Sequence, residues 1–399
     1  SIYANFLVVN LYDTLYRYRY LARPYDITPN LAQDLPEISE DGLVVTIKIK
    51  PGVHFIDDPA FPDGKGRELT AHDFIYSIKR HFDPVTISAG AWLWQNRIVG
   101  LDAWKENGSD YQQEIQGLQA LDNTTIRIEL TQPFPQLVHT MTSGLSAVVP
   151  REAVAEYGRE LANHPVGSGP FTLVRTNSAQ AVLEPNPEFR KEAFSLQAEG
   201  YDPATQGHLG LEALEGRFPP FVDRLDVNFI SEEAARWNAY SSGDVDFIKV
   251  PVSQFDGILD SRSPVTAKPE ILQDNHFDSL LESGFVFTNF NLDDERIGYH
   301  PDATRNERNH ALRCAIIKGF DWERRNEIFY YGIGKVFPGI VPPLTMEFDD
   351  TADTASIERD VEGARKLLTE NGWDSTNLPV LEYGFPSSVT DRQMFEQFR

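Results

Sequence analysis

The residues best suited to hold a metal ion are scattered along the chain. The nine histidines include no H-E-x-x-H pair, which is the spacing that places two imidazoles and a general base on one helix. Asp293-Asp294-Glu295 is the closest acidic cluster, but it lacks the alternating ligand positions of a calcium loop. Cys314 is the only cysteine, which excludes an intrachain disulfide and a paired-cysteine zinc site. We expect no metal and no cofactor.

Two glycine-containing motifs resemble catalytic loops without completing the pattern. Gly167-Ser168-Gly169 lacks the residue that stands between serine and each glycine in a nucleophile elbow, and we interpret it as a tight turn. Gly332-Ile333-Gly334-Lys335 has its first glycine too close for a phosphate loop, and Val336 stands where a hydroxyl would hold magnesium. Carboxylates are so numerous that no pair can be assigned as acid and base. The sequence predicts no enzyme.

Length and composition favour a folded protein of several domains. The 399 residues exceed one ordinary core and predict two or three domains, and 41% hydrophobic with 12% aromatic residues suffices to fill them. The formal charge of −24 repels nucleic acid. We interpret this charge as a source of solubility, and a preference for cationic ligands is the alternative. No apolar run approaches the roughly 20 residues of a membrane span, and no leader opens the chain.

Hydrophobic periodicity predicts a mixed α/β chain. Thr70 is a good helix N-cap with Asp73 at the N3 position, and Asn371-Gly372 is a typical helix C-terminus. The polar, Gly- and Pro-rich residues 197–220 are expected to form a surface insertion. The expected strands are 43–50, 124–130, 225–230 and 245–250, and the expected helices are 70–81, 232–240, 312–320 and 361–370.

The order of sequence landmarks resembles the family 5 solute-binding proteins, which include oligopeptide, dipeptide and nickel receptors. The opening L-Y-D-T-L-Y and the later P-V-G-S-G-P-F and S-G-D-V-D are typical of that family. The long loops at 54–67 and 98–118 resemble its larger proteobacterial branch. The matching segments are 11–16, 30–35, 38–43, 50–55, 69–73, 76–80, 165–171, 183–189, 242–246 and 311–324.

The resemblance implies a two-lobed α/β fold, the periplasmic-binding-protein type II fold with an extra N-lobe subdomain. It places the core of lobe I at residues 1–22 and 166–284, the extra subdomain at 23–165, and an incomplete lobe II at 285–399. We expect a chain truncated at both ends. It lacks the first family strand and a signal peptide, and it stops before the part that normally completes the second lobe.

The resemblance also implies a function without chemistry. Such a receptor of an ABC importer captures its ligand in the periplasm by hinge closure and delivers it to permease subunits in the membrane. Peptides, above all oligopeptides, are the expected ligands, and a monomer is the expected state. A metal chelate, haem, sugar or opine remains the alternative, because the family landmarks do not encode ligand choice.

The first group of expected ligand-binding residues is Trp92, Trp94 and Gln95. The resemblance places an aromatic side chain of the oligopeptide receptors against ligand at this position. Two tryptophans separated by one residue share a face if the segment is extended. Core packing of at least one of them is the alternative.

The second group of expected ligand-binding residues is Phe247, Lys249 and Val250. They follow the S-G-D-V-D landmark, where family members pair backbone groups with peptide in the manner of an added strand. Lys249 could meet a ligand carboxylate, and the alternative is an ordinary exposed lysine.

The third group of expected ligand-binding residues is Asn289 and Asn291. They lie in the apolar, partly alternating segment 285–291, which stands where the family chain crosses to the second lobe along a hinge strand. Their amides are expected to supply hydrogen-bond donors and acceptors to ligand, and an ordinary core strand is the alternative for the segment.

Overall fold

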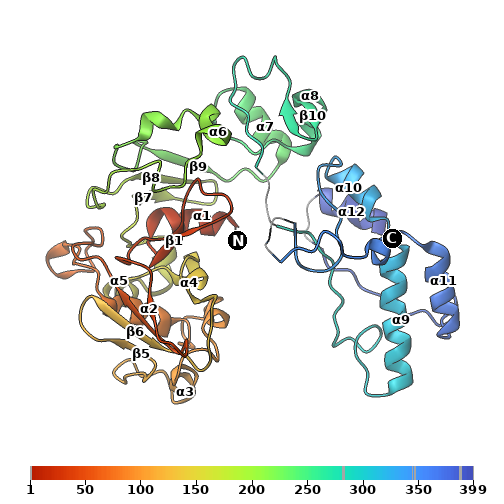
Figure 1. Ribbon diagram of the computed structural model, residues 1–399, viewed down its shortest axis with the longest axis horizontal. Helices are drawn as coiled ribbons and strands as arrows, with labels where there is room; N and C mark the ends of the chain where they lie inside the picture. The colour runs from red at the N-terminus through yellow and green to blue at the C-terminus, as the bar shows by residue number, and fades with distance from the viewer. Residues whose placement is uncertain (1, 281–283, 344, 346, 386–388, 399) are drawn as a thin grey trace. The chain divides into compact units, whose positions relative to one another are not determined.

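The structure is a computed structural model that describes all residues except 1, 281–283, 344, 346, 386–388 and 399 (Figure 1). The chain divides into two compact units, residues 1–229 and 230–399. Each unit combines helices with antiparallel strands, as the periodicity predicted. The predicted limits of the lobes, at residues 22, 165 and 284, remain a prediction.

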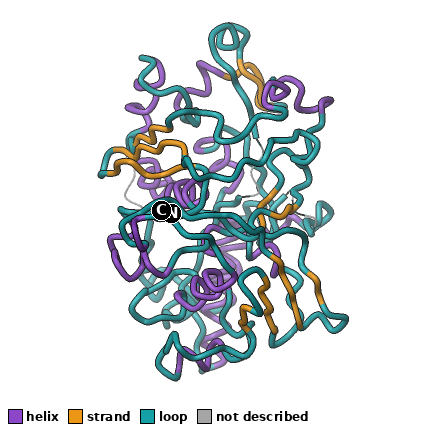
Figure 2. The backbone as a smooth tube through the Cα atoms, turned by 90° about the vertical axis from the view of Figure 1, so that its left-hand side faces the viewer, coloured by secondary structure: helices purple, strands orange, loops and turns teal. Residues whose placement is uncertain are grey.

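A four-stranded antiparallel sheet forms the larger core of the first unit, with strand order β3-β4-β6-β5 (Figure 2). The two central strands confirm the predicted strands at 43–50 and 124–130. Their alternating residues are buried on one face, where Val45 pairs with Ile128 and Ile47 with Ile126. This period of two is what a half-buried sheet requires. The strands are β3 Glu37–Ile38, β4 Val44–Lys48, β5 Leu118–Ala120 and β6 Thr125–Glu129.

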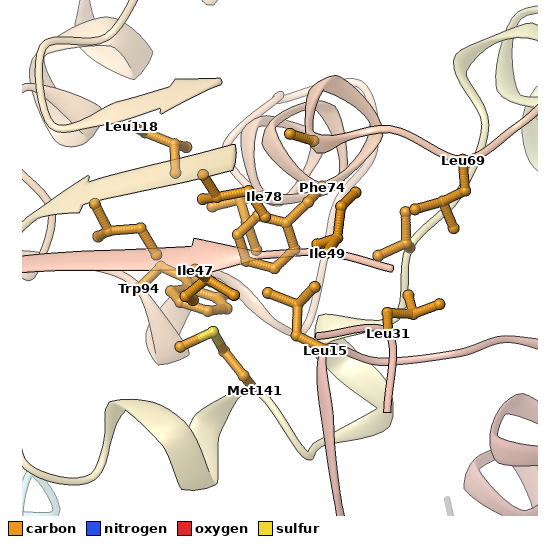
Figure 3. Close-up of a cluster of buried hydrophobic side chains, with 14 of the residues drawn as sticks. Leu15, Leu31, Ile47, Ile49, Leu69, Phe74, Ile78, Trp94, Leu118 and Met141 are labelled. Atoms are coloured by element: carbon orange, nitrogen blue, oxygen red, sulfur yellow. The ribbon is translucent and has the colours of Figure 1, made fainter. Parts of the chain in front are cut away.

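Helix α2, Ala71–Arg80, covers that core and begins where the sequence predicted. The Asp73 carboxylate accepts a hydrogen bond from the Thr70 amide at 2.9 Å, which is one half of a capping box. Figure 3 shows Phe74 and Ile78 of this helix above Ile47 of the sheet. Both helix side chains are fully buried, so the helix is held mainly by its apolar face.

A second, three-stranded sheet of order β7-β8-β9 completes the first unit. Its small core joins Phe171, Ala181 and Leu183 to Leu11 of helix α1 (Ile2–Leu11), which lies against β7 (Figure 1). Strand β9 confirms the strand predicted at 225–230. The strands are β7 Phe171–Thr176, β8 Gln180–Pro185 and β9 Leu225–Asn228.

The rest of the first unit consists of short elements. Strands β1 Tyr16–Tyr18 and β2 Ile27–Pro29 pair with each other. The predicted insertion at 197–220 is largely exposed, but buried Glu199 anchors it by accepting two hydrogen bonds from the Arg17 guanidinium. The helices are α1 Ile2–Leu11, α3 Leu101–Glu106, α4 Leu137–Thr140, α5 Arg151–Tyr157 and α6 Pro203–Gln206.

Helices make up most of the regular structure in the described part of the second unit. Helix α9 packs on α11, and the Trp373 indole beyond α11 donates to the Arg308 carbonyl at 2.8 Å. Helix α11 spans the predicted residues, and Gly372 follows it with a φ of 73°. Helix α9 contains most of the helix predicted at 312–320 and begins earlier. The elements are α7 Glu233–Ser241, α8 Phe255–Ile258, β10 Leu259–Arg262, β11 Val265–Ala267, α9 Ala303–Gly319, α10 Trp322–Phe329, α11 Val361–Glu370 and α12 Val389–Phe398.

Candidate functional site

The two tryptophans of the first predicted group point to different environments. Residues Ala91–Leu93 form a 3-10 turn, so the expected extended conformation with a shared face is wrong. Trp92 is 61% exposed, whereas Trp94 is fully buried. Figure 3 shows Trp94 beside Met141 below the sheet, and its ring meets Phe74 edge-on with centroids 6.3 Å apart. Trp94 therefore packs in the core, which corrects its assignment to a ligand-facing surface.

The remaining residue of this group, Gln95, is exposed beside Trp92. The Gln95 amide N–H donates to the Ala91 carbonyl at 2.9 Å, which fixes the backbone of this turn. Trp92 supplies flat apolar area, and Gln95 supplies an amide that can both donate and accept. These two residues keep the properties that the predicted contact with ligand requires.

The second predicted group lies after helix α7, in a segment that forms no strand. Residues 245–250 are all described, and none of them belongs to a strand, so the strand predicted there is wrong. Phe247 is 88% exposed, Lys249 is exposed and Val250 is half-buried. The Val245 amide donates to the Ala239 carbonyl at 3.3 Å, and the segment adds no strand to any sheet. The local pattern V-D-F-I-K-V misled because β propensity is decided by packing partners.

The third predicted group lies in residues 284–291, which are described and also form no strand. Asn289 and Asn291 are both exposed. The Asn291 side-chain oxygen accepts from the Asp293 amide at 3.1 Å, which engages it in a local turn. Thr288 Oγ1 lies 3.3 Å from the Tyr383 hydroxyl, so this segment runs beside residues near the end of the chain. The predicted hinge strand is not observed as a strand.

The three groups are divided between the two compact units. Trp92 and Gln95 belong to the first unit, and the other two groups belong to the second.

A buried polar network, which sequence reasoning missed, joins three of the landmark segments to Arg190, which directly follows a fourth. The Asp13 carboxylate accepts from the Arg190 guanidinium at 2.8 Å, from Ser168 Oγ at 2.9 Å and from the Asn30 amide at 3.0 Å. Burial alone would lower the pKa of Arg190, but the charges and hydrogen bonds of Asp13 and Glu192 together outweigh it and raise the pKa above its ordinary value. The network locks these segments together and holds Arg190 charged.

The Gly167-Ser168-Gly169 segment packs against the backbone around Leu11, two residues before Asp13. A Cβ atom on Gly167 would stand 2.0 Å from the Leu11 carbonyl oxygen, and one on Gly169 would stand 2.6 Å from the Leu11 carbonyl carbon. The Ser168 hydroxyl donates its hydrogen bond to the Asp13 carboxylate. The expected tight turn is a bend in the structure, and glycine is required there for close approach of two chain segments.

The described residues give no support for metal or membrane-spanning sites. Within them, no group of three or more His, Cys, Asp and Glu side chains is arranged to hold a metal ion. None of the helices in the described part of the chain has the length and apolarity of a membrane span.

Comparison with known proteins identifies the class. The structure is similar to a solved structure of a periplasmic oligopeptide-binding protein from Borrelia burgdorferi, with a TM-score of 0.66 and 18% identity. The match covers all of the present chain and 68% of the Borrelia chain. The mannopinic acid complex of MoaA from A. tumefaciens R10 matches 92% of the present chain and 60% of its own, with a TM-score of 0.62 and 20% identity. The fold is that of type II periplasmic binding proteins, which confirms the predicted α/β fold class.

The family follows from the sequence. A profile of the bacterial extracellular solute-binding proteins, family 5 (Middle), matches residues 26–398, so the chain belongs to that family. This is a family of receptors and not of enzymes, as expected. The glutathione-binding protein of Pectobacterium atrosepticum is 29% identical over 153 residues, which are 38% of this chain and 25% of that protein. The matched part thus spans a quarter of that curated relative.

Proposed function

We propose that this protein is the extracytoplasmic receptor of an ABC importer and that it captures peptides, most favourably oligopeptides. The family match over residues 26–398 carries the proposal. Ligand is bound where the two lobes meet, and closure about the hinge is selected because ligand contacts both lobes only in the closed form. The membrane permease then recognises the closed receptor. The receptor acts as a monomer in the periplasm.

The ligand-contacting residues in this proposal are those that remain accessible. Trp92 and Gln95 lie on one lobe, where an exposed indole suits an apolar side chain of the ligand. Phe247, Lys249 and Val250 lie in the segment 245–250, which belongs to no strand and to which an extended peptide would pair in the manner of an added strand. Asn289 and Asn291 complete the set.

A non-peptide ligand is the second candidate. The structural relative in complex with mannopinic acid favours it, because that small acid occupies a protein of the same fold. A metal chelate, haem or sugar belongs to this alternative as well.

The experiment that tests the proposal is native mass spectrometry of the purified protein, followed by thermal-shift scans with defined di- to pentapeptides and with glutathione. A receptor for peptides is expected to release mixed short peptides and to be stabilised when they are added back. Release of one defined non-peptide compound would replace the peptide assignment with the alternative. Conversion of an added compound into product would refute the receptor function.

A further inference from the structure

The segment of residues 82–92 presents three large apolar side chains to solvent. Val85 is 79% exposed, Ile87 is 77% exposed and Trp92 is 61% exposed. Ile87 has a φ of 50°, a conformation that a β-branched residue adopts only when its surroundings hold it there. An apolar surface on a constrained segment is typical of a contact site rather than of an ordinary loop.

His81 at the end of helix α2 supplies this constraint. Its Nδ1 lies 2.5 Å from Ser88 Oγ, and its Nε2 lies 2.7 Å from the Leu145 carbonyl oxygen. Because a carbonyl only accepts, Nε2 carries the hydrogen, and Nδ1 accepts from the Ser88 hydroxyl. The Ser88 oxygen in turn accepts from the Gly90 amide at 3.0 Å. One neutral imidazole therefore joins α2, the apolar segment and the turn at Leu145.

The packing around the ring leaves no room for adjustment. A Cβ atom on Gly90 would stand 2.6 Å from Cε1 of His81, so the segment lies directly against the imidazole. Protonation would add a hydrogen at Nδ1, which could then no longer accept from Ser88. The Ser88 hydroxyl would have to turn its hydrogen away, and the charged ring would be buried beside the Arg80 guanidinium.

Burial and the neighbouring Arg80 charge disfavour protonation of His81. Burial lowers the pKa of His81, the hydrogen bond to Leu145 opposes this shift, and the neighbouring Arg80 charge lowers the pKa further. On the segment itself, the Asp83 carboxylate accepts from the Val85 amide at 2.9 Å and from the Tyr111 hydroxyl at 2.9 Å. Ser88 and the Leu145 carbonyl are uncharged. The neutral ring is thus the form that fits this site.

We propose that His81 is a positioning residue for ligand capture. Its neutral ring holds residues 82–92 so that Val85, Ile87 and Trp92 form a contact surface for an apolar side chain of the ligand, and protonation of the ring releases the segment. The inference rests on the proposed function, because Trp92 is one of the residues proposed to contact ligand.

The first test needs no ligand. Hydrogen–deuterium exchange of the segment 82–92 is measured at about pH 8 and about pH 5, corrected for the intrinsic exchange rate. We expect protection to fall about tenfold in acid in the unmodified protein. In His81→Gln, an amide N–H can still reach the Leu145 carbonyl but cannot titrate, so protection should not change with pH. His72→Gln, an exposed histidine of the same helix, should behave as the unmodified protein.

Ser88→Ala provides a second variant that leaves the imidazole in place. It removes one of the two bonds to the ring, so the segment should exchange faster at both pH values. Equal protection at both pH values in the unmodified protein, or the same acid response in His81→Gln, would overturn the role of His81.

The second test uses a phenylalanine-containing tripeptide and its all-glycine counterpart. The unmodified protein should bind the first peptide about tenfold more weakly in acid, His81→Gln should not, and the all-glycine peptide should show no such difference. If the segment is released in acid but neither peptide binds at any pH, the protein is not a peptide receptor. The role of His81 in holding the segment would then still stand. If the unmodified protein and His81→Gln bind the phenylalanine-containing peptide with the same dependence on pH, the inference is refuted.

Discussion

The Arg190 guanidinium donates to both carboxylate oxygens of Asp13, at 2.8 and 3.2 Å, although 177 positions of sequence separate the two residues. The side chains are 14% and 6% exposed. A buried pair of this geometry is strongly destabilised when one partner is removed, because the other charge stays buried.

Replacement of Asp13 by alanine is expected to lower the free energy of unfolding by about 3–5 kcal/mol, measured by urea denaturation. Asp226→Ala is the matched control, since its partner Arg224 lies on the surface with half of its side chain exposed. The control should leave the urea midpoint unchanged. Equal effects of the two replacements would contradict the structural role of the network.

Gly167→Ala is expected to destabilise the protein by about 1–3 kcal/mol, because its Cβ atom would overlap the Leu11 carbonyl oxygen. Gly257→Ala serves as the control, since a Cβ atom there meets nothing within 4 Å. Thermal unfolding of both variants measures the difference. A Gly167 variant as stable as the Gly257 variant would show that the two segments do not approach as closely as described.

Trp94→Ala should cost about 3–5 kcal/mol of stability, since it removes a fully buried ring. Trp92→Ala should change stability by less than about 0.5 kcal/mol, because its side chain is largely exposed. Chemical denaturation of the two variants, read by circular dichroism, makes the comparison. The reverse order would restore Trp94 as a surface residue.

Glu199 is expected to make the protein sensitive to acid. Burial raises the pKa of Glu199, but the hydrogen bonds from Arg17 and from the Tyr20 amide together lower it by more. The pKa of Glu199 is therefore below its usual 4.5. A carboxyl whose folded pKa is depressed stabilises the fold above its unfolded pKa, and this stabilisation is lost as pH falls through the folded pKa.

The replacement Glu199→Gln should therefore cost about 1–2 kcal/mol at neutral pH and almost nothing below the folded pKa of Glu199. Unfolding free energies of both proteins over a pH series measure this. Glu106→Gln, an exposed glutamate on α3, is the control and should leave the pH profile unchanged. A constant difference between the Glu199 variant and the unmodified protein across the series would contradict the assignment.

Sequence alone predicted the elements whose signals are local. Strands β4 and β6 show alternation, and α2 begins at a threonine followed by an aspartate at the N3 position. Such signals need no knowledge of distant neighbours. The resemblance to family 5 was equally accessible, because it depends on the order of short motifs, and the family profile confirms it.

The misses share a physical cause. The strand at 245–250 failed because strand formation needs a partner that a single segment cannot reveal. Trp92 and Trp94 separated into exposed and buried positions because the backbone turns there, which the residue types did not show. The pair of Asp13 with Arg190 escaped notice because only the folded chain brings the two together.

The network around Asp13 also bears on how receptors of this fold could be redesigned. Three of its members come from the segments by which the family resemblance was recognised, and the fourth directly follows one, yet their polar groups bond to one another inside the protein. These motifs are therefore typical of the fold and do not indicate which ligand is bound. An engineer who wishes to retarget the receptor can leave them untouched and vary the exposed positions, such as Val85 and Trp92, as an independent module.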